Sequence, residues 1–198
     1  MTTTHATSDS DADLLRAMRG GTAAAFQALY RRHQGPLFRF ALLRCGSPDT
    51  AADVVQEVFM GLLTDSLRFD PLRGALPHFL FGVARNLILR HEHPRHLELP
   101  LPEPDEEDDD AEQASERHEP LARLLSDELA EQVRRAIALL PPHYRDPVIL
   151  YELHELSYLE IAEICQVDIG TIRSRLSRGR AAMAKRLALH RPTTINEA

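Results

Sequence analysis

The stretch that decides the fold is LSYLEIAEICQVDIGTIRSRL, residues 156–176. Apolar residues at helical spacing form two runs, one before and one after the short segment Gln166–Asp168. Ser157 followed by Glu160 matches a capping box, in which the two side chains bond backbone N–H groups at the start of a helix. Asp168 can cap the second helix in the same way. The stretch therefore predicts two helices joined by a tight turn, as in a helix-turn-helix motif.

The second helix of this stretch has one apolar face and one basic face. The residues expected to face the core are Ile172, Leu176, Met183 and Leu187. The residues expected to point outward are Arg173, Ser174, Ser177, Arg178 and Arg180. A helix fits the DNA major groove, and arginine can bond guanine or phosphate. An ordinary helical hairpin with solvated arginines is the alternative, but the capping box, the turn length and the one-sided arginines favour DNA binding.

Further helices are expected on both sides of the chain's middle. Apolar residues at helical spacing predict a helix over Leu121–Leu140, ended by Pro141 and Pro142. The next helix is expected to begin at Asp146 and Pro147, as cap and first residue, and to end near His154.

The N-terminal half also predicts helices, with neither an alternating strand pattern nor an internal repeat. The expected helices run from a Ser10 or Asp11 cap to Arg19, from Thr22 to Gly35, from Pro36 to Cys45, from Ser47 to about Ser66, and from about Leu76 to His91. The predicted fold class is therefore all-α.

An acidic segment separates the two halves. The chain carries a net charge of −7, but residues 97–120 alone hold eleven acidic side chains against one arginine, so the rest is mildly basic. Prolines and repelling carboxylates disfavour packing, which predicts an extended, flexible linker. The expected organisation is a helical domain over residues 9–93, a linker over 94–120 and a second helical domain over 121–190.

Other sequence features exclude several classes of protein. No apolar run approaches the roughly 18 residues of a membrane span, and the first residues lack the pattern of a signal peptide. Cys45 and Cys165 lie in apolar helical patterns and are expected to be buried thiols in a reducing compartment. His91, His93 and His96 could bind metal, but solvated histidines are the favoured interpretation. We expect a cytoplasmic protein with no catalytic residue, cofactor or metal site.

Two motifs resemble a known family. The segments around Ala138–Pro141, Val148–Leu150 and Gly170–Leu176 closely resemble region 4 of sigma-70-family proteins. Ala51–Phe59 resembles their region 2.2, and Phe79–Asn86 resembles regions 2.3 and 2.4. Regions 1.1 and 3 have no counterpart, which is typical of the extracytoplasmic-function (ECF) group.

The resemblance implies a role for each part. The partners would be core RNA polymerase (its β′ clamp helices and β flap), promoter DNA and an anti-sigma factor, with no membrane insertion. The residues that would bind core polymerase are Asp53, Gln56, Glu57 and Phe59. Those that would take up unstacked bases of the −10 element are Phe69, Arg73, Phe79, Arg85 and Asn86. Those that would contact the −35 element are Thr171, Arg173, Ser174, Ser177, Arg178 and Arg180. The acidic linker would follow the RNA-exit path of the polymerase.

Two other functions remain open from sequence alone. A stand-alone helix-turn-helix regulator would bind duplex DNA but would not need the Asp53–Phe59 helix. An interaction protein that sequesters a regulator is the other alternative, because Ala52 replaces the glutamate usual in region 2.2.

Overall fold

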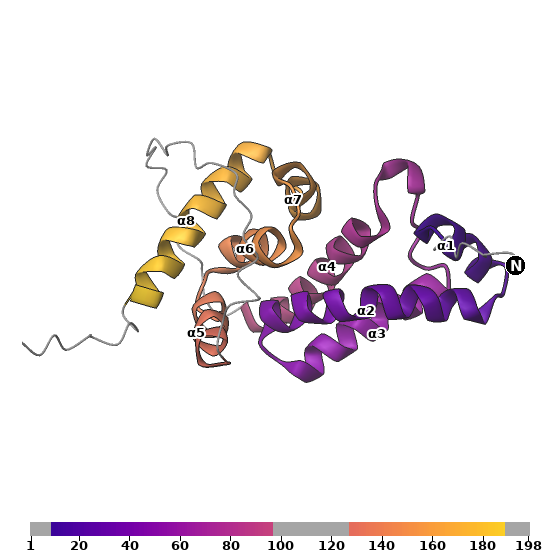
Figure 1. Cartoon of the computed structure of the whole chain (residues 1–198), viewed down its shortest axis with the longest axis horizontal. Coiled ribbons are helices and arrows are strands. Elements are labelled where there is room, and N and C mark those ends of the chain that lie inside the picture. Colours follow the sequence, from indigo (N-terminus) through magenta and orange to yellow (C-terminus); the bar gives the residue numbers. More distant parts are fainter. Residues whose placement is uncertain (1–8, 97–126, 189–198) are drawn as a thin grey trace, which may run out of the picture. The chain divides into compact units, whose positions relative to one another are not determined.

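The computed structural model of the chain describes residues 9–96 and 127–188. These residues form eight α-helices and one short 3-10 helix, and no strand occurs among them (Figure 1). By spatial proximity they divide into two units. The first contains the residues up to Leu42 and Ser47–Leu87, and the second contains Leu43–Gly46 and the residues from Ile88 onward. The all-α prediction is confirmed.

The first unit begins with α1 (Asp11–Arg19), which has the predicted bounds. The Ser10 side chain caps the helix by accepting a hydrogen bond from the backbone N–H of Asp13. The helix ends at Gly20, and Gly21 follows with φ of 89°, a conformation that favours glycine.

α2 (Ala23–Cys45) is one continuous helix that includes Pro36, so the predicted break at Gly35 is wrong. A proline inside a helix removes one backbone hydrogen bond. Here the buried residues keep the same helical phase across the proline, because Leu29, Leu37 and Phe40 are all at most 1% exposed. Packing along the whole face therefore outweighs the local preference for a break.

α3 (Pro48–Leu63) and α4 (Leu76–His96) are both predicted helices, but their ends differ from the predicted ends. Ser47 caps α3 as predicted, but the helix ends before Ser66, at a turn where Asp65 has φ of 54°. Between the two helices lies the 3-10 helix η1 (Pro71–Arg73). α4 continues past His91 and includes Pro94, the residue at which the linker was expected to begin.

The core of the first unit is apolar and partly aromatic. Phe40 and Phe81 pack edge to face with ring centroids 5.4 Å apart, and both are buried. Val54, Val58 and Leu62 contribute the buried face of α3. This packing fixes which side of α3 is left at the surface.

The second unit contains α5 (Asp127–Ala138), α6 (Pro142–His154), α7 (Tyr158–Cys165) and α8 (Ile169–Ala188). α8 contacts each of the other three helices. The predicted first part of the helix before Pro141, residues 121–126, lies outside the described residues. The capping box at Ser157 and Glu160 is confirmed, with both reciprocal bonds present.

The predicted start of α6 at Asp146 is wrong, because the helix begins at Pro142. Pro142 occupies the first helical turn, where proline suits the helix, and Pro147 lies inside it. Asp146 is not a cap but a buried acid, 2% exposed, that forms an ion pair with Arg44. Glu92 also accepts two hydrogen bonds from Arg44, at 2.5 and 2.8 Å. Burial alone would lower the pKa of the Arg44 guanidinium, but these carboxylates raise it above its usual value.

The two cysteines differ in burial. Cys165 is buried at the end of α7, as its apolar pattern predicted. Cys45, at the end of α2, is only partly buried.

Candidate nucleic-acid and protein interfaces

The exposed side of α3 carries three of the four residues predicted to bind a protein partner. Asp53, Gln56 and Glu57 are all exposed. Their spacing of three and four residues puts them on one face of the helix. Met60, 50% exposed, continues the same stripe by one turn. The stripe therefore combines acidic, amide and apolar groups, a composition suited to a protein surface.

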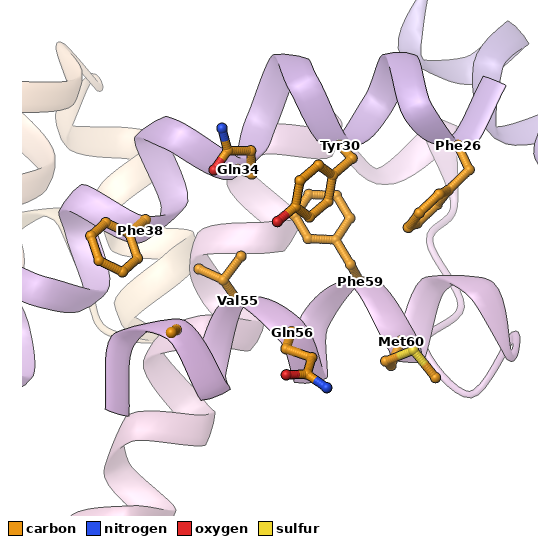
Figure 2. A pocket seen from close by; sticks show the side chains of 9 residues that line it. Phe26, Tyr30, Gln34, Phe38, Val55, Gln56, Phe59 and Met60 are labelled. Carbon is orange, nitrogen blue, oxygen red and sulfur yellow. The ribbon is translucent and has the colours of Figure 1, made fainter. Parts of the chain in front are cut away.

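Phe59, the fourth predicted residue, points the other way. It is 3% exposed, and its ring centroid lies 4.8 Å from that of Tyr30 and 6.2 Å from that of Phe26. Figure 2 shows these three rings between α2 and α3. Phe59 thus holds α3 against α2 instead of standing in the exposed stripe.

A hollow of about 390 Å³ lies beside these rings, between α2 and α3 (Figure 2). Tyr30, 40% exposed, and Met60 lie at its surface, so apolar area remains open to a partner. The sequence prediction missed Tyr30 and Met60 as surface residues. The aromatic spacing on α2 was the available signal, but only the fold shows that the rings meet α3. The hollow is lined by Phe26, Tyr30, Gln34, Phe38, Ala52, Val55, Gln56, Phe59 and Met60.

The loop between α3 and α4 contains part of the predicted −10 site. Phe69 is 8% exposed, and its ring centroid lies 5.4 Å from that of Phe79 on α4. The structure therefore brings these two predicted residues together at the base of the loop. The side chain of Arg73 lies outside the described residues. On α4, Arg85 is half-buried and Asn86 is exposed.

The loop is held locally by a hydrogen bond between a side chain and the backbone and by a proline. The Asp70 carboxylate accepts a hydrogen bond from the backbone N–H of Leu72 at 3.0 Å, and Pro71 opens the 3-10 turn. Leu72 itself is 95% exposed, the highest value among the large apolar side chains at the described surface. Sequence reasoning did not single out this residue.

α8 presents the predicted polar face. Arg173, Ser174, Ser177 and Arg178 are exposed and Thr171 is half-buried. Ile172 and Leu176, on the opposite side, are at most 1% exposed. Met183 and Leu187, also expected in the core, are only half-buried. The exposed side chains follow a helix of the type that fits a major groove, at the position expected of a recognition helix.

Arg180 belongs to a different environment from the other arginines of α8. Its guanidinium bonds the Glu152 carboxylate at 2.6 Å and lies 4.6 Å from the centre of the Tyr151 ring, both on α6. Burial alone would lower its pKa, but the bond to Glu152 raises it above the usual value. Tyr158 on α7 packs against Tyr151 with ring centroids 5.2 Å apart. Arg180 thus ties α8 to α6 in the described structure.

Within residues 9–96 and 127–188, no cluster of His, Cys, Asp and Glu could hold a metal ion. The side chains of His93 and His96 lie outside this description. No helix in the described ranges combines the length and the apolar content that crossing a bilayer requires.

Comparison with known families matches both units. The Sigma-70 region 2 family matches residues 29–92, which include the exposed stripe of α3 and the loop at Phe69. The Sigma-70, region 4 family matches residues 130–183, which include α7 and most of α8.

Individual proteins agree with these matches. The chain is 32% identical over 187 residues to the ECF RNA polymerase sigma-E factor of Escherichia coli K12, covering 88% of this chain and 92% of that protein. It is 30% identical over 178 residues to the ECF RNA polymerase sigma factor SigE of Mycolicibacterium smegmatis, covering 88% of this chain and 66% of that protein. Among solved structures, the sigma factor RpoE from Bartonella quintana, crystallised with the anti-sigma factor NepR, aligns with a TM-score of 0.61 at 25% identity. That alignment covers 84% of this chain and 98% of RpoE.

Proposed function

The chain belongs to the ECF group of sigma-70-family RNA polymerase sigma factors, and on that premise we propose which of its surfaces bind core polymerase and which bind promoter DNA. It acts in transcription initiation, with core RNA polymerase and promoter DNA as its partners. We propose further that it has no catalytic activity of its own and works in the cytoplasm, where the polymerase is.

The exposed stripe of α3 is the proposed polymerase-binding surface. Asp53, Gln56 and Glu57 would make the polar contacts, and Met60 would add apolar area beside them. Phe59 would contribute indirectly, by holding α3 against α2, because its side chain is buried against Tyr30. Polar groups around an apolar centre are the usual composition of a protein interface.

The loop after α3 and the first turns of α4 are the proposed −10 surface. Phe79 is half-buried and could stack on an unpaired base, with Phe69 supporting its ring from the inner side. Arg73, Arg85 and Asn86 would supply polar contacts to bases or backbone. The role of Arg73 rests on its position in the sequence alone.

α8 is the proposed −35 recognition helix, and its exposed polar face is the observation that carries the assignment. Arg173, Ser174, Ser177 and Arg178 share that face, and Thr171 lies near the start of the helix. The resemblance placed Arg180 among the residues that contact the −35 element, where an arginine can bond a phosphate. Its bonds to Glu152 and Tyr151 support a different role, in which Arg180 holds the recognition helix against α6.

Charge reversal on α3 tests the polymerase-binding surface. Asp53→Lys and Glu57→Lys, singly and together, should weaken association with purified core polymerase, because both carboxylates are exposed on one face. Glu163→Lys makes the same charge change at an exposed position on α7 and should leave association unchanged. Thermal unfolding of each variant checks that the fold is intact. Association as strong as that of the unsubstituted protein for all four variants would contradict the assignment.

An anti-sigma partner is a separate proposal, supported by the complex in which the Bartonella sigma factor was solved. A protein that covered the α3 stripe would compete with core polymerase for the same side chains. A candidate partner should therefore be displaced by excess core, and simultaneous binding of both would contradict this proposal.

A further inference from the structure

The side chains of α8 are rich in hydrogen-bond donors and poor in acceptors. The helix carries five arginines and one lysine, and neither side chain can accept a hydrogen bond. It contains no Asp, Glu, Asn or Gln, so its only side-chain oxygens are the hydroxyls of Thr171, Ser174 and Ser177. A ligand group that needs an oxygen acceptor from a side chain of this helix must therefore use one of these three hydroxyls.

The proton of the Ser174 hydroxyl is already engaged within the helix. This hydroxyl donates a hydrogen bond to the backbone carbonyl of Thr171, with the two oxygen atoms 2.9 Å apart. The direction of the bond is certain, because a carbonyl oxygen can only accept. A carbonyl has two lone pairs, so the Thr171 oxygen can accept this bond together with a backbone N–H bond of the helix. The Ser174 oxygen therefore keeps lone pairs for a ligand but has no proton to donate.

This acceptor is exposed and held in place before any ligand binds. Ser174 is exposed and shares one face of α8 with Arg178, four residues later. The bond to the Thr171 carbonyl restricts the hydroxyl to one position relative to the helix. Donation of the proton also polarises the oxygen and makes it a stronger acceptor. A ligand therefore meets an ordered acceptor beside a guanidinium donor, and little entropy is lost in ordering the hydroxyl on binding.

The DNA major groove offers two kinds of partner for such an acceptor. The hydrogen-bond donors on the base edges there are the N6 amine of adenine and the N4 amine of cytosine. Guanine and thymine present acceptors in the groove, and these suit arginine. A hydroxyl whose proton is engaged would place its lone pairs against the lone pairs of those acceptors. Ser174 should therefore favour an amine and disfavour the acceptor edges of guanine and thymine.

We propose that Ser174 contacts the −35 element as a hydrogen-bond acceptor for the exocyclic amine of an adenine or a cytosine. This inference rests on the proposed assignment of α8 to −35 DNA and adds which chemical group of the base is recognised. At a rise of about 1.5 Å per residue, Ser174 and Arg178 lie about 6 Å apart along the helix axis. Base pairs of B-DNA are stacked about 3.4 Å apart. The amine should therefore lie within about two base pairs of the base that Arg178 contacts.

The test removes the serine hydroxyl and the base amine separately and together. Full-length protein combined with core polymerase is bound to a panel of −35 variants at one salt concentration. Ser174→Ala should relax the preference at one position, where the unsubstituted protein prefers adenine or cytosine. At that position 2-aminopurine replaces adenine, or 2-pyrimidinone replaces cytosine, and both analogues lack the amine in the major groove. The analogue should weaken binding of the unsubstituted protein about three- to tenfold and that of Ser174→Ala no further.

Two further variants separate the contact from a general effect on the helix. Ser174→Thr keeps a hydroxyl that can bond the same carbonyl and should retain the base preference. Thr64→Ala is the matched control, because the exposed Thr64 hydroxyl also donates to a carbonyl of its own helix, that of Met60, at 2.9 Å. It should leave all −35 preferences unchanged. Thermal unfolding checks that each variant is folded.

Three results would overturn the proposal. Equal weakening of both proteins by the amine-lacking base would assign the amine to another group. If a 7-deazapurine, which lacks the N7 acceptor, weakened only the unsubstituted protein, Ser174 would be a donor. A uniform loss for Ser174→Ala on every −35 sequence would place the hydroxyl on a phosphate. If Arg178→Ala also left every −35 preference unchanged, the assignment of α8 to the −35 element would fail, and not the role of Ser174 alone.

Discussion

Arg178 and Arg180 are two residues apart on α8, yet the helix turns them towards different surroundings. Arg178 is on the exposed polar face with Ser174 and Ser177. Arg180 is engaged by Glu152 and Tyr151 on α6. Arginines so close in sequence can therefore contribute to DNA binding through different physical effects, one direct and one through the position of the helix.

Alanine substitution should separate these two effects. Arg178→Ala should cost about 1–3 kcal/mol and relax the preference at one base pair, because a bond to a base edge is lost. Arg180→Ala should weaken all −35 sequences alike and lower the stability of the second unit by about 1 kcal/mol, because an exposed ion pair and a ring contact are lost.

The measurement is binding of the reconstituted holoenzyme to a panel of −35 variants at several salt concentrations, with thermal unfolding of each protein. A phosphate contact by Arg180 would make the salt dependence shallower by about one unit of slope on substitution. We expect no such change. A shallower slope with unchanged stability would restore the phosphate contact, and a base-specific loss for Arg180→Ala would contradict both interpretations.

Residue-scale prediction from sequence succeeded where helical periodicity alone decides exposure. Asp53, Gln56 and Glu57 follow from the spacing of the buried valines on α3, as do Arg173 and Arg178 from Ile172 and Leu176. The surroundings of Phe59 and Arg180 could not be predicted from periodicity, since they depend on α2 and α6, which are distant in sequence. Leu72 was missed because a short turn has no periodic signal.

At the scale of elements, α8 packs against α6 through a glycine. A Cβ added at Gly179 would lie 2.7 Å from the Val148 Cγ2 atom and 3.5 Å from the Tyr144 Cβ atom. Val148 is 1% exposed, so it has little room to move away. The close approach of the two helices therefore requires a residue without a side chain at this position.

Alanine at two glycines of α8 should have opposite effects on stability. Gly179→Ala should destabilise the protein by about 1–3 kcal/mol through overpacking against α6. Gly170→Ala, where nothing lies within 4 Å of the added Cβ, should stabilise it by about 0.5–1 kcal/mol through higher helix propensity. Thermal unfolding measures both, and a stabilised Gly179→Ala would show that the two helices do not approach as described.

Helix ends show where local signals decide structure and where they do not. Ser10, Ser47 and Ser157 were predicted as caps and are caps, because a serine before a helix satisfies backbone N–H groups without help from distant residues. Pro36 and Pro147 were predicted at helix starts but lie inside helices. Around Pro36 buried apolar residues continue on either side, whereas Pro147 lies between the buried acid Asp146 and the buried residues Val148, Ile149 and Leu150. In both helices the packing energy exceeds the cost of one missing hydrogen bond.

At the scale of the whole molecule, charge is unevenly distributed along the chain. Residues 97–120, which lie outside the described residues, hold eleven of the thirty acidic side chains. The rest is mildly basic, as expected of surfaces that meet DNA. If the acidic segment occupies a basic nucleic-acid channel of the polymerase, its charge and length matter more than its order of residues.

Scrambling and neutralising the acidic segment should therefore differ. A scramble of residues 103–119 keeps charge and length and should preserve initiation, whereas replacing the acids by Asn and Gln should impair it. Transcript yield from the reconstituted holoenzyme measures both. Equal damage by the two changes would indicate that a specific structure forms there, and no damage by either would contradict a role for the charge.

The order of the two sigma-type units was predictable from sequence, since each carries a motif that matches its family over tens of residues. The boundaries of the linker remain a prediction. α4 extends to His96 and so includes Pro94, the residue at which the linker was expected to begin.

The central claim, that this chain directs core RNA polymerase to promoters, is tested most directly by run-off transcription from a genomic promoter library. Purified core polymerase is assayed with the full-length chain and without it. We expect new transcripts whose start sites share two upstream sequence elements, with Asp53→Lys/Glu57→Lys unable to support them. A stand-alone regulator or a sequestering protein would produce no transcripts beyond those of core alone, and that result would contradict the account.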